Sequence, residues 1–135
     1  MKKLEDQVRA FMEAAGQRVG QEPGDISEEM VELGILLIRE EFKELGEAIL
    51  KGYPTKDLDS LAEIADAIGD LLYVVTWAGL AWGFPMPEIM DEIQRANMAK
   101  FGPGSSKDEN GKVQKPPGWT PPDIAGILAR FRGSR

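Results

Sequence analysis

Three glutamates in one short stretch have the residue type and spacing that metal chemistry requires. The stretch REEFKELGEAI contains Glu40, Glu41 and Glu44. On a helix, Glu41 and Glu44 lie on one flank of the apolar face, whereas Arg39 and Lys43 lie on the other side. Neighbours three or four residues away from Glu41 and Glu44 are apolar or acidic, so neither glutamate has the basic partner that usually accompanies a carboxylate on a helix surface.

A second group of acidic residues lies in the next predicted helix. Four carboxylates follow one stripe of it: Asp59, Glu63, Asp66 and Asp70. No lysine or arginine occurs between Lys56 and Arg95, and the rest of this helix is almost entirely apolar, as in a helix buried on most sides. Burying an unpaired ionised carboxylate costs on the order of several kcal/mol. A lone EExxE stretch is usually a solvated helix face, but both groups together predict a cation from outside the chain.

The amino-acid composition narrows the choice of cation. The chain of 135 residues contains no cysteine and no histidine. Disulfides, thiolate or imidazole zinc sites, Ser-His-Asp triads and histidine-ligated di-iron sites are therefore excluded. Oxygen ligands favour Mg²⁺, with Mn²⁺ as a substitute. Mg²⁺ held by carboxylates commonly binds a polyphosphate and activates a water molecule.

Charge is distributed unevenly along the chain. The net charge of −7 combines −10 over residues 1–100 with +3 over residues 101–135. The acidic part argues against a nucleic acid polymer as a partner. In the basic part, Lys107, Lys112 and Lys115 could contact phosphate oxygens, although a basic loop is equally often only solvated.

Apolar spacing and helix-end residues predict helices over 3–17, 26–50, 57–82, 86–101 and 123–132. Asp25, with Glu28 three residues later, resembles a capping box at the start of the second helix. Gly83 ends the third helix, and Pro87 suits the first turn of the fourth. Asn110 and Gly111 predict a turn in the segment that follows. No strand pattern of useful length occurs.

These elements predict an all-α fold, an antiparallel helical bundle of four main helices with an irregular basic C-terminal arm. We expect residues 1–100 to form the core and residues 101–135 to form the arm, with its short helix, as part of the same domain. The sequence has no uninterrupted apolar run of 18 residues and no signal-peptide core. It therefore predicts a soluble protein of the cytoplasm, or of the host cytoplasm for a viral protein, with no membrane partner.

These residues resemble a known family, the all-α nucleotide pyrophosphohydrolases, which include MazG-like enzymes, dimeric dUTPases and phosphoribosyl-ATP pyrophosphohydrolases. Their EExxE motif matches Glu40, Glu41 and Glu44, and their ExxD motif matches Glu63 and Asp66. The resemblance continues through FMEAAGQ, ADAIGDLLYVV, RANMAKF and GKVQKPPGWTPPD, so it covers most of the chain. Many relatives place the aspartate directly before a Leu-Leu-aromatic run, which selects Asp70, so both aspartates remain candidates.

The resemblance implies roles for individual residues. The metal ligands would be Glu41, Glu44, Glu63 and Asp66, with Asp70 either a ligand or a residue behind the ligands. Glu40 would orient or deprotonate the attacking water beside Glu41. Asn97, Lys100, Lys112 and Lys115 match positions that contact phosphate. Candidates for reading the base are Phe11, Gln17, Asn97 and Trp119.

The implied reaction is hydrolysis of a nucleoside triphosphate between its α and β phosphates, giving a monophosphate and pyrophosphate. Candidate substrates are dUTP, dCTP and dGTP, and the sequence does not select among them. Relatives assemble as dimers or tetramers, so a homodimer or homotetramer is expected. Two alternatives remain, a phosphoribosyl-ATP pyrophosphohydrolase, which the dUTPase-like tail disfavours, and a non-catalytic helical interaction module.

Overall fold

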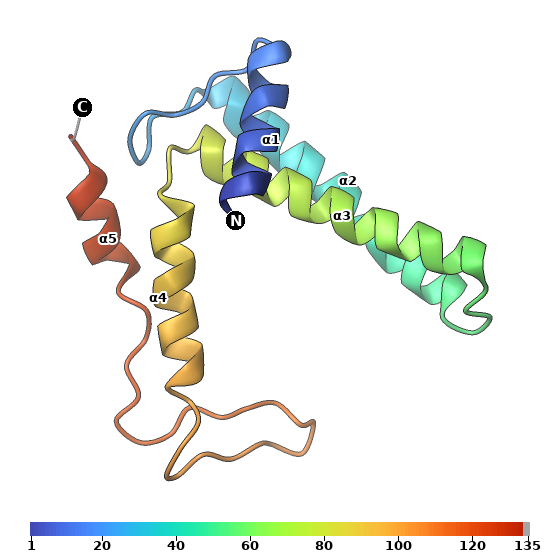
Figure 1. Cartoon of the computed structure of the whole chain (residues 1–135), viewed down its shortest axis with the longest axis vertical. Coiled ribbons are helices and arrows are strands. Elements are labelled where there is room, and N and C mark those ends of the chain that lie inside the picture. Colours follow the sequence, from blue (N-terminus) through green and yellow to red (C-terminus); the bar gives the residue numbers. More distant parts are fainter. Residues whose placement is uncertain (134–135) are drawn as a thin grey trace. The chain divides into compact units, whose positions relative to one another are not determined.

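The chain is all-helical, as the sequence predicts. The computed structural model describes residues 1–133, which contain five helices and no strand (Figure 1). The helices are α1 (Lys2–Ala14), α2 (Glu28–Gly52), α3 (Leu58–Ala81), α4 (Met86–Met98) and α5 (Ile124–Phe131). A single bridge between Lys107 and Val113 closes the turn at Asn110 and Gly111.

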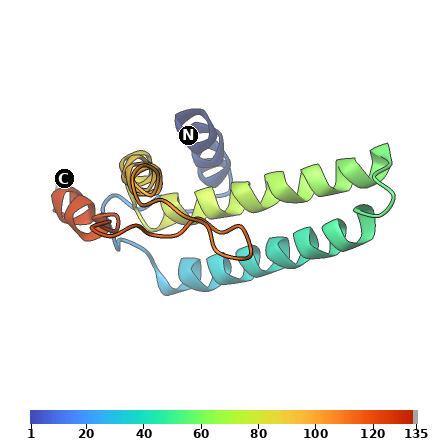
Figure 2. The ribbon, with the colours of Figure 1, turned by 90° about the horizontal axis from the view of Figure 1, so that it is seen from below.

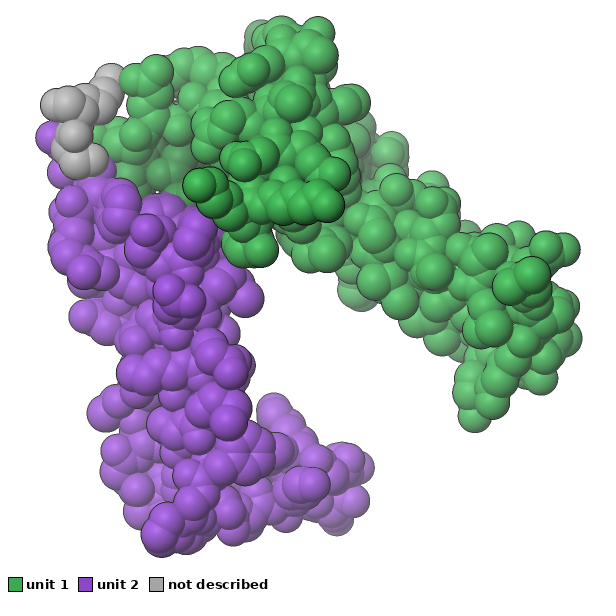
Figure 3. Space-filling model, viewed as in Figure 1, with its two compact units in different colours: residues 1–84, 135 green, residues 85–134 purple. Residues whose placement is uncertain are grey.

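The chain folds into two compact units, with the boundary between Phe84 and Pro85 (Figure 3). The first unit contains α1, α2 and α3, and the second contains α4, the arm and α5. The predicted division into a core of residues 1–100 and an arm of residues 101–135 stays a prediction, and the last two residues of that arm lie outside the described residues.

Helices α2 and α3 form an antiparallel hairpin within the first unit. They lie side by side in two perpendicular views and are joined by a short turn (Figures 1 and 2). Asp57 begins α3 as predicted, since its carboxylate accepts a hydrogen bond from the Ser60 N–H at 2.8 Å. Trp82 and Gly83 end α3 as predicted, and Gly83 adopts a φ of 71°. The hairpin places the acidic stretches of both helices next to each other.

The predicted capping box at the start of α2 is wrong. Ser27 caps the helix instead, its hydroxyl accepting a hydrogen bond from the Met30 N–H at 3.3 Å. Asp25 is engaged by Arg18, whose guanidinium donates two hydrogen bonds to it at 2.6 and 2.8 Å. The helix therefore begins at Glu28, directly after the Ser27 cap and two residues later than predicted.

The core of the first unit lies where α1 crosses the C-terminal half of α3. Its buried side chains are Val8, Met12, Trp77, Leu80 and Ala81. The indole N–H of Trp77 donates a hydrogen bond to the Gln17 side-chain oxygen at 2.9 Å, so the core also holds the loop after α1. By length and composition alone α3 could cross a membrane, a property that core helices of soluble proteins share. Its most buried part is the part packed in this core.

The loop between α1 and α2 is pinned to the end of α3 by backbone hydrogen bonds. The Gly20 N–H donates to the Leu80 carbonyl at 2.9 Å, and the Gly24 N–H donates to the Trp82 carbonyl at 3.0 Å. A methyl group added at Gly83 would collide with the Glu22 carbonyl oxygen. This end of the molecule is therefore tightly packed backbone against backbone.

Gly83→Ala should lower the free energy of unfolding by at least about 2 kcal/mol, because it combines a left-handed backbone with a collision against a carbonyl. Thermal and urea unfolding measure the change. Gly46→Ala is the matched control, since nothing lies within 4 Å of its added methyl group. In the middle of α2 this control should stabilise by about 0.5–1 kcal/mol. Equal stability of Gly83→Ala and the parent would contradict the packing described here.

Candidate functional site

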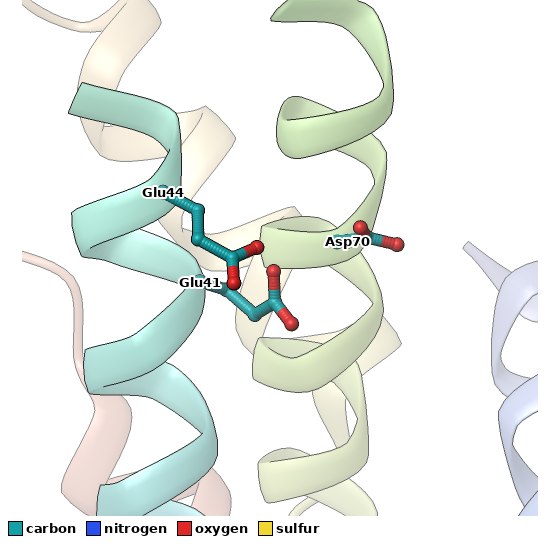
Figure 4. A group of neighbouring side chains, drawn as sticks. All are labelled: Glu41, Glu44 and Asp70. Carbon is teal, nitrogen blue, oxygen red and sulfur yellow. The ribbon is translucent and has the colours of Figure 1, made fainter. Parts of the chain in front are cut away.

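Three carboxylates from α2 and α3 come together. One oxygen each from Glu41, Glu44 and Asp70 lies within 4.8 Å of the other two. Glu41 and Glu44 are three residues apart and so share one face of α2. Figure 4 shows their carboxylates turned toward each other and toward α3, which carries Asp70. The antiparallel pairing of the two helices is what makes a single cluster from the two stretches.

The cluster carries negative charge that no basic side chain compensates. Among residues 1–133, no lysine or arginine forms an ion pair with Glu41, Glu44 or Asp70. One oxygen of Glu41 is buried and has no hydrogen-bond partner. Burial raises the pKa of Glu41, and the negative charges of Glu44, Asp70 and Glu40 raise it further.

The donor set fits a hard divalent cation. Oxygens on opposite sides of one Mg²⁺ are about 4.2 Å apart, so a spread of 4.8 Å suits one ion after a small side-chain adjustment. The buried Glu41 oxygen without a partner is the group that such an ion would satisfy. Glu41, Glu44 and Asp70 are therefore the residues that could hold the metal.

The other predicted acidic residues lie outside this cluster. Glu40 is exposed on α2, although its charge contributes to the raised pKa of Glu41. Glu63 lies on α3 with an oxygen 3.9 Å from the ammonium of Lys51. Asp66 is exposed on α3. Of the acidic residues predicted on α3, the described structure brings only Asp70 together with the two glutamates.

Lys51 is a residue near the cluster that sequence reasoning missed. Together with Glu63 it lines an open hollow of about 220 Å³, and the other lining residues are Glu44, Glu47 and Ala48. Its spacing could have indicated this position, because Lys51 lies seven residues after Glu44 and therefore on the same face of α2. Lys51 brings positive charge to the border of the acidic cluster.

Two candidates for base recognition also belong to the first unit. Phe11 is about half exposed, and its ring meets Tyr73 edge to face at 5.9 Å between centroids. Gln17 already accepts the hydrogen bond from the indole of Trp77, which fixes the orientation of its side-chain amide. Gln17 thus has a structural role in this unit, whatever else it contacts.

The remaining candidates belong to the second unit. Lys100 donates a side-chain hydrogen bond to the Asn97 oxygen at 3.2 Å. The ammonium groups of Lys100 and Lys115 lie 5.5 and 5.1 Å from the ring centre of Trp119. Lys112 is exposed, and its backbone N–H donates to the Asp108 carboxylate in the turn. Four of these five residues therefore form one group at the end of α4.

A comparison with models of protein families shows the family to which the chain belongs. A family model described as phosphoribosyl-ATP pyrophosphohydrolase matches residues 8–97, about two thirds of the chain. The chain belongs to this family. The family lies within the MazG-like nucleotide pyrophosphohydrolase superfamily, so the predicted relationship is confirmed. No curated protein matches the chain at a significant level.

Membership gives the general class of activity. The family consists of pyrophosphohydrolases, which hydrolyse acid anhydrides of nucleotides. The matched residues include both acidic stretches and end at Asn97, before the arm. The acidic cluster is therefore the part of the molecule to which the family relationship applies most directly.

The raised pKa of Glu41 gives the metal-free protein a defined pH dependence. A folded-state pKa above the unfolded value contributes stability that is complete below the unfolded pKa and is lost as the pH rises through the folded pKa. The melting temperature of Glu41→Gln relative to that of the parent should therefore rise between about pH 4 and 7, because the parent alone loses this contribution. Circular dichroism in EDTA measures both curves.

Glu47→Gln is the control, since Glu47 lies outside the cluster and 3.9 Å from Lys43. Its melting curve should follow that of the parent. Parallel curves for Glu41→Gln and the parent would show that Glu41 is not held in an unfavourable charged state.

Proposed function

We propose that the protein is a metal-dependent nucleotide pyrophosphohydrolase that cleaves a nucleoside triphosphate between its α and β phosphates. The observation that carries this proposal is the cluster of Glu41, Glu44 and Asp70, three neighbouring carboxylates without a basic partner. Such a cluster supports a hard cation and a phosphate substrate, which is the chemistry of the family.

The reaction adds water across the anhydride and releases a nucleoside monophosphate and pyrophosphate. Bound at the cluster, Mg²⁺ or Mn²⁺ would neutralise phosphate charge and lower the pKa of water. The carboxylates of the chain accept the proton that the attacking water loses. Glu41, Glu44 and Asp70 would hold the ion. Glu40, the exposed neighbour of Glu41, would orient the attacking water or accept its proton.

A homodimer or homotetramer is part of this proposal. Large apolar side chains are exposed along α2 and α3, and they include Phe42, Leu50, Leu58, Ile68 and Leu72. This number of exposed large apolar side chains on one helical hairpin supports association with other copies of the chain. We also propose that the protein acts in the cytoplasm on a free nucleotide, with no nucleic acid polymer or membrane as a partner.

Candidate substrates are dUTP, dCTP and dGTP, which the predicted contacts from Asn97, Lys100, Lys112 and Lys115 would hold by phosphate. Phosphoribosyl-ATP is the second candidate, because the matching family carries that name. Both substrates contain the same type of anhydride, so the same acidic cluster would serve either reaction.

A release assay tests the activity. The protein is incubated with Mg²⁺ and each nucleoside triphosphate, deoxynucleoside triphosphate or phosphoribosyl-ATP, and monophosphate and pyrophosphate are quantified. We expect turnover of one substrate, with loss of activity in EDTA. No turnover of any substrate, together with no change in melting temperature on adding Mg²⁺, would favour a non-catalytic interaction module.

Two matched variants test the ligands. Asp70→Asn should reduce turnover by at least about 100-fold and abolish the stabilisation by Mg²⁺, because it removes a carboxylate from the cluster. Asp66→Asn makes the same chemical change on α3 outside the cluster and should keep the stabilisation. Activity assays and thermal unfolding with and without Mg²⁺ give the comparison. Loss of both properties in Asp66→Asn alone would assign the metal to the literal ExxD motif.

A further inference from the structure

Two lysines meet at a single aromatic ring in the second unit. The ammonium nitrogens of Lys100 and Lys115 lie 5.5 and 5.1 Å from the centre of the Trp119 ring. Neither lysine forms an ion pair with a carboxylate among residues 1–133. Two like charges have thus been gathered without a counter-charge from the described chain.

The end of α4 explains why Trp119 is fixed at this place. The backbone N–H of Lys100 donates to the Asn97 carbonyl at 3.2 Å, so the last turn is tightened. The Ala96 carbonyl is therefore left to another donor. The indole N–H of Trp119 donates to that carbonyl at 2.6 Å. The half-buried ring is therefore held by a hydrogen bond to the helix end, beside the first lysine.

A local turn brings the second lysine to the same ring. The sequence Pro116-Pro117-Gly118-Trp119 closes with a hydrogen bond from the Trp119 N–H to the Pro116 carbonyl at 3.1 Å. Proline at the second position and Gly118, with a φ of 80°, at the third are typical of a type II turn. The turn folds Lys115 back toward the indole.

The π face of an indole attracts ammonium groups and so offsets part of the repulsion between them. We infer that Trp119 is a positioning residue, which gathers Lys100 and Lys115 into a binding site for the polyphosphate group of the substrate. This inference rests on the proposed function for the identity of the ligand. The site itself is defined by two uncompensated cations and the hydrogen-bonded ring between them. Trp119 then contacts lysines rather than the base.

Inorganic tripolyphosphate in EDTA tests the site without metal or catalysis. Isothermal titration calorimetry should show saturable binding to the parent, accompanied by a change in tryptophan emission. Trp119→Leu should weaken binding about tenfold, because it removes the π face. Trp119→Phe keeps a ring and should stay within about threefold of the parent, although it loses the indole hydrogen bond.

A combined variant separates positioning from a purely structural effect. If Trp119 acts through the lysines, Trp119→Leu should have no further effect in a chain that already carries Lys100→Met and Lys115→Met. Additive losses in that chain, or unchanged binding by Trp119→Leu alone, would overturn the inference. Lys56→Met is the matched control, because Lys56 lies 4.6 Å from the ring centre of Tyr53 without a second lysine, and its binding should equal that of the parent.

The binding experiment and the release assay can fail separately, so they test this inference and the proposed function independently. Failure of every substrate in the release assay, with tripolyphosphate binding that depends on Trp119, would reject the proposed function and keep this site. Turnover by the parent, with the same KM in Trp119→Leu, would reject the positioning role and keep the proposed function. The expected result is a raised KM with little change in kcat.

Discussion

Repulsion among three carboxylates is the constraint on which the first unit depends. Glu41, Glu44 and Asp70 are brought within 4.8 Å by the pairing of α2 with α3, and no lysine or arginine among residues 1–133 forms an ion pair with them. That pairing must therefore be stabilised elsewhere. The apolar core around Trp77, together with the backbone hydrogen bonds that hold the loop before α2 against the end of α3, supplies this stabilisation.

The sequence predicted those parts of the fold that are locally determined. Asp57, Gly83 and Pro87 mark the helix ends where the structure has them, because each acts through its own backbone or nearest turn. The predicted cap at Asp25 was wrong, because Asp25 pairs with Arg18 seven residues earlier. The pairing of Glu41 with Glu44 followed from helical periodicity. Which of Asp66 and Asp70 lies beside these glutamates could not be predicted, because that depends on the register of α3 against α2, which no single-helix pattern contains.

The two units carry opposite and separately uncompensated charges. The first presents carboxylates without a cation, and the second presents Lys100 and Lys115 without an anion. The family match covers the acidic helices and ends at Asn97. Lys100, Lys115 and Trp119, here called the lysine group, all lie after the matched residues. Sequence reasoning named Lys100, Lys115 and Trp119, but it assigned Trp119 to the base rather than to the two lysines.

The lysine group at Trp119 is built from very little chain. Its parts are the tightened last turn of one helix and a five-residue segment, Lys115 to Trp119, whose shape is set by a proline and a glycine. No residue of the intervening loop is needed to define the turn. Such an element is modular, so grafting a Lys-Pro-Pro-Gly-Trp segment beside a helix that ends in Asn-x-x-Lys offers a compact design for a synthetic phosphate receptor.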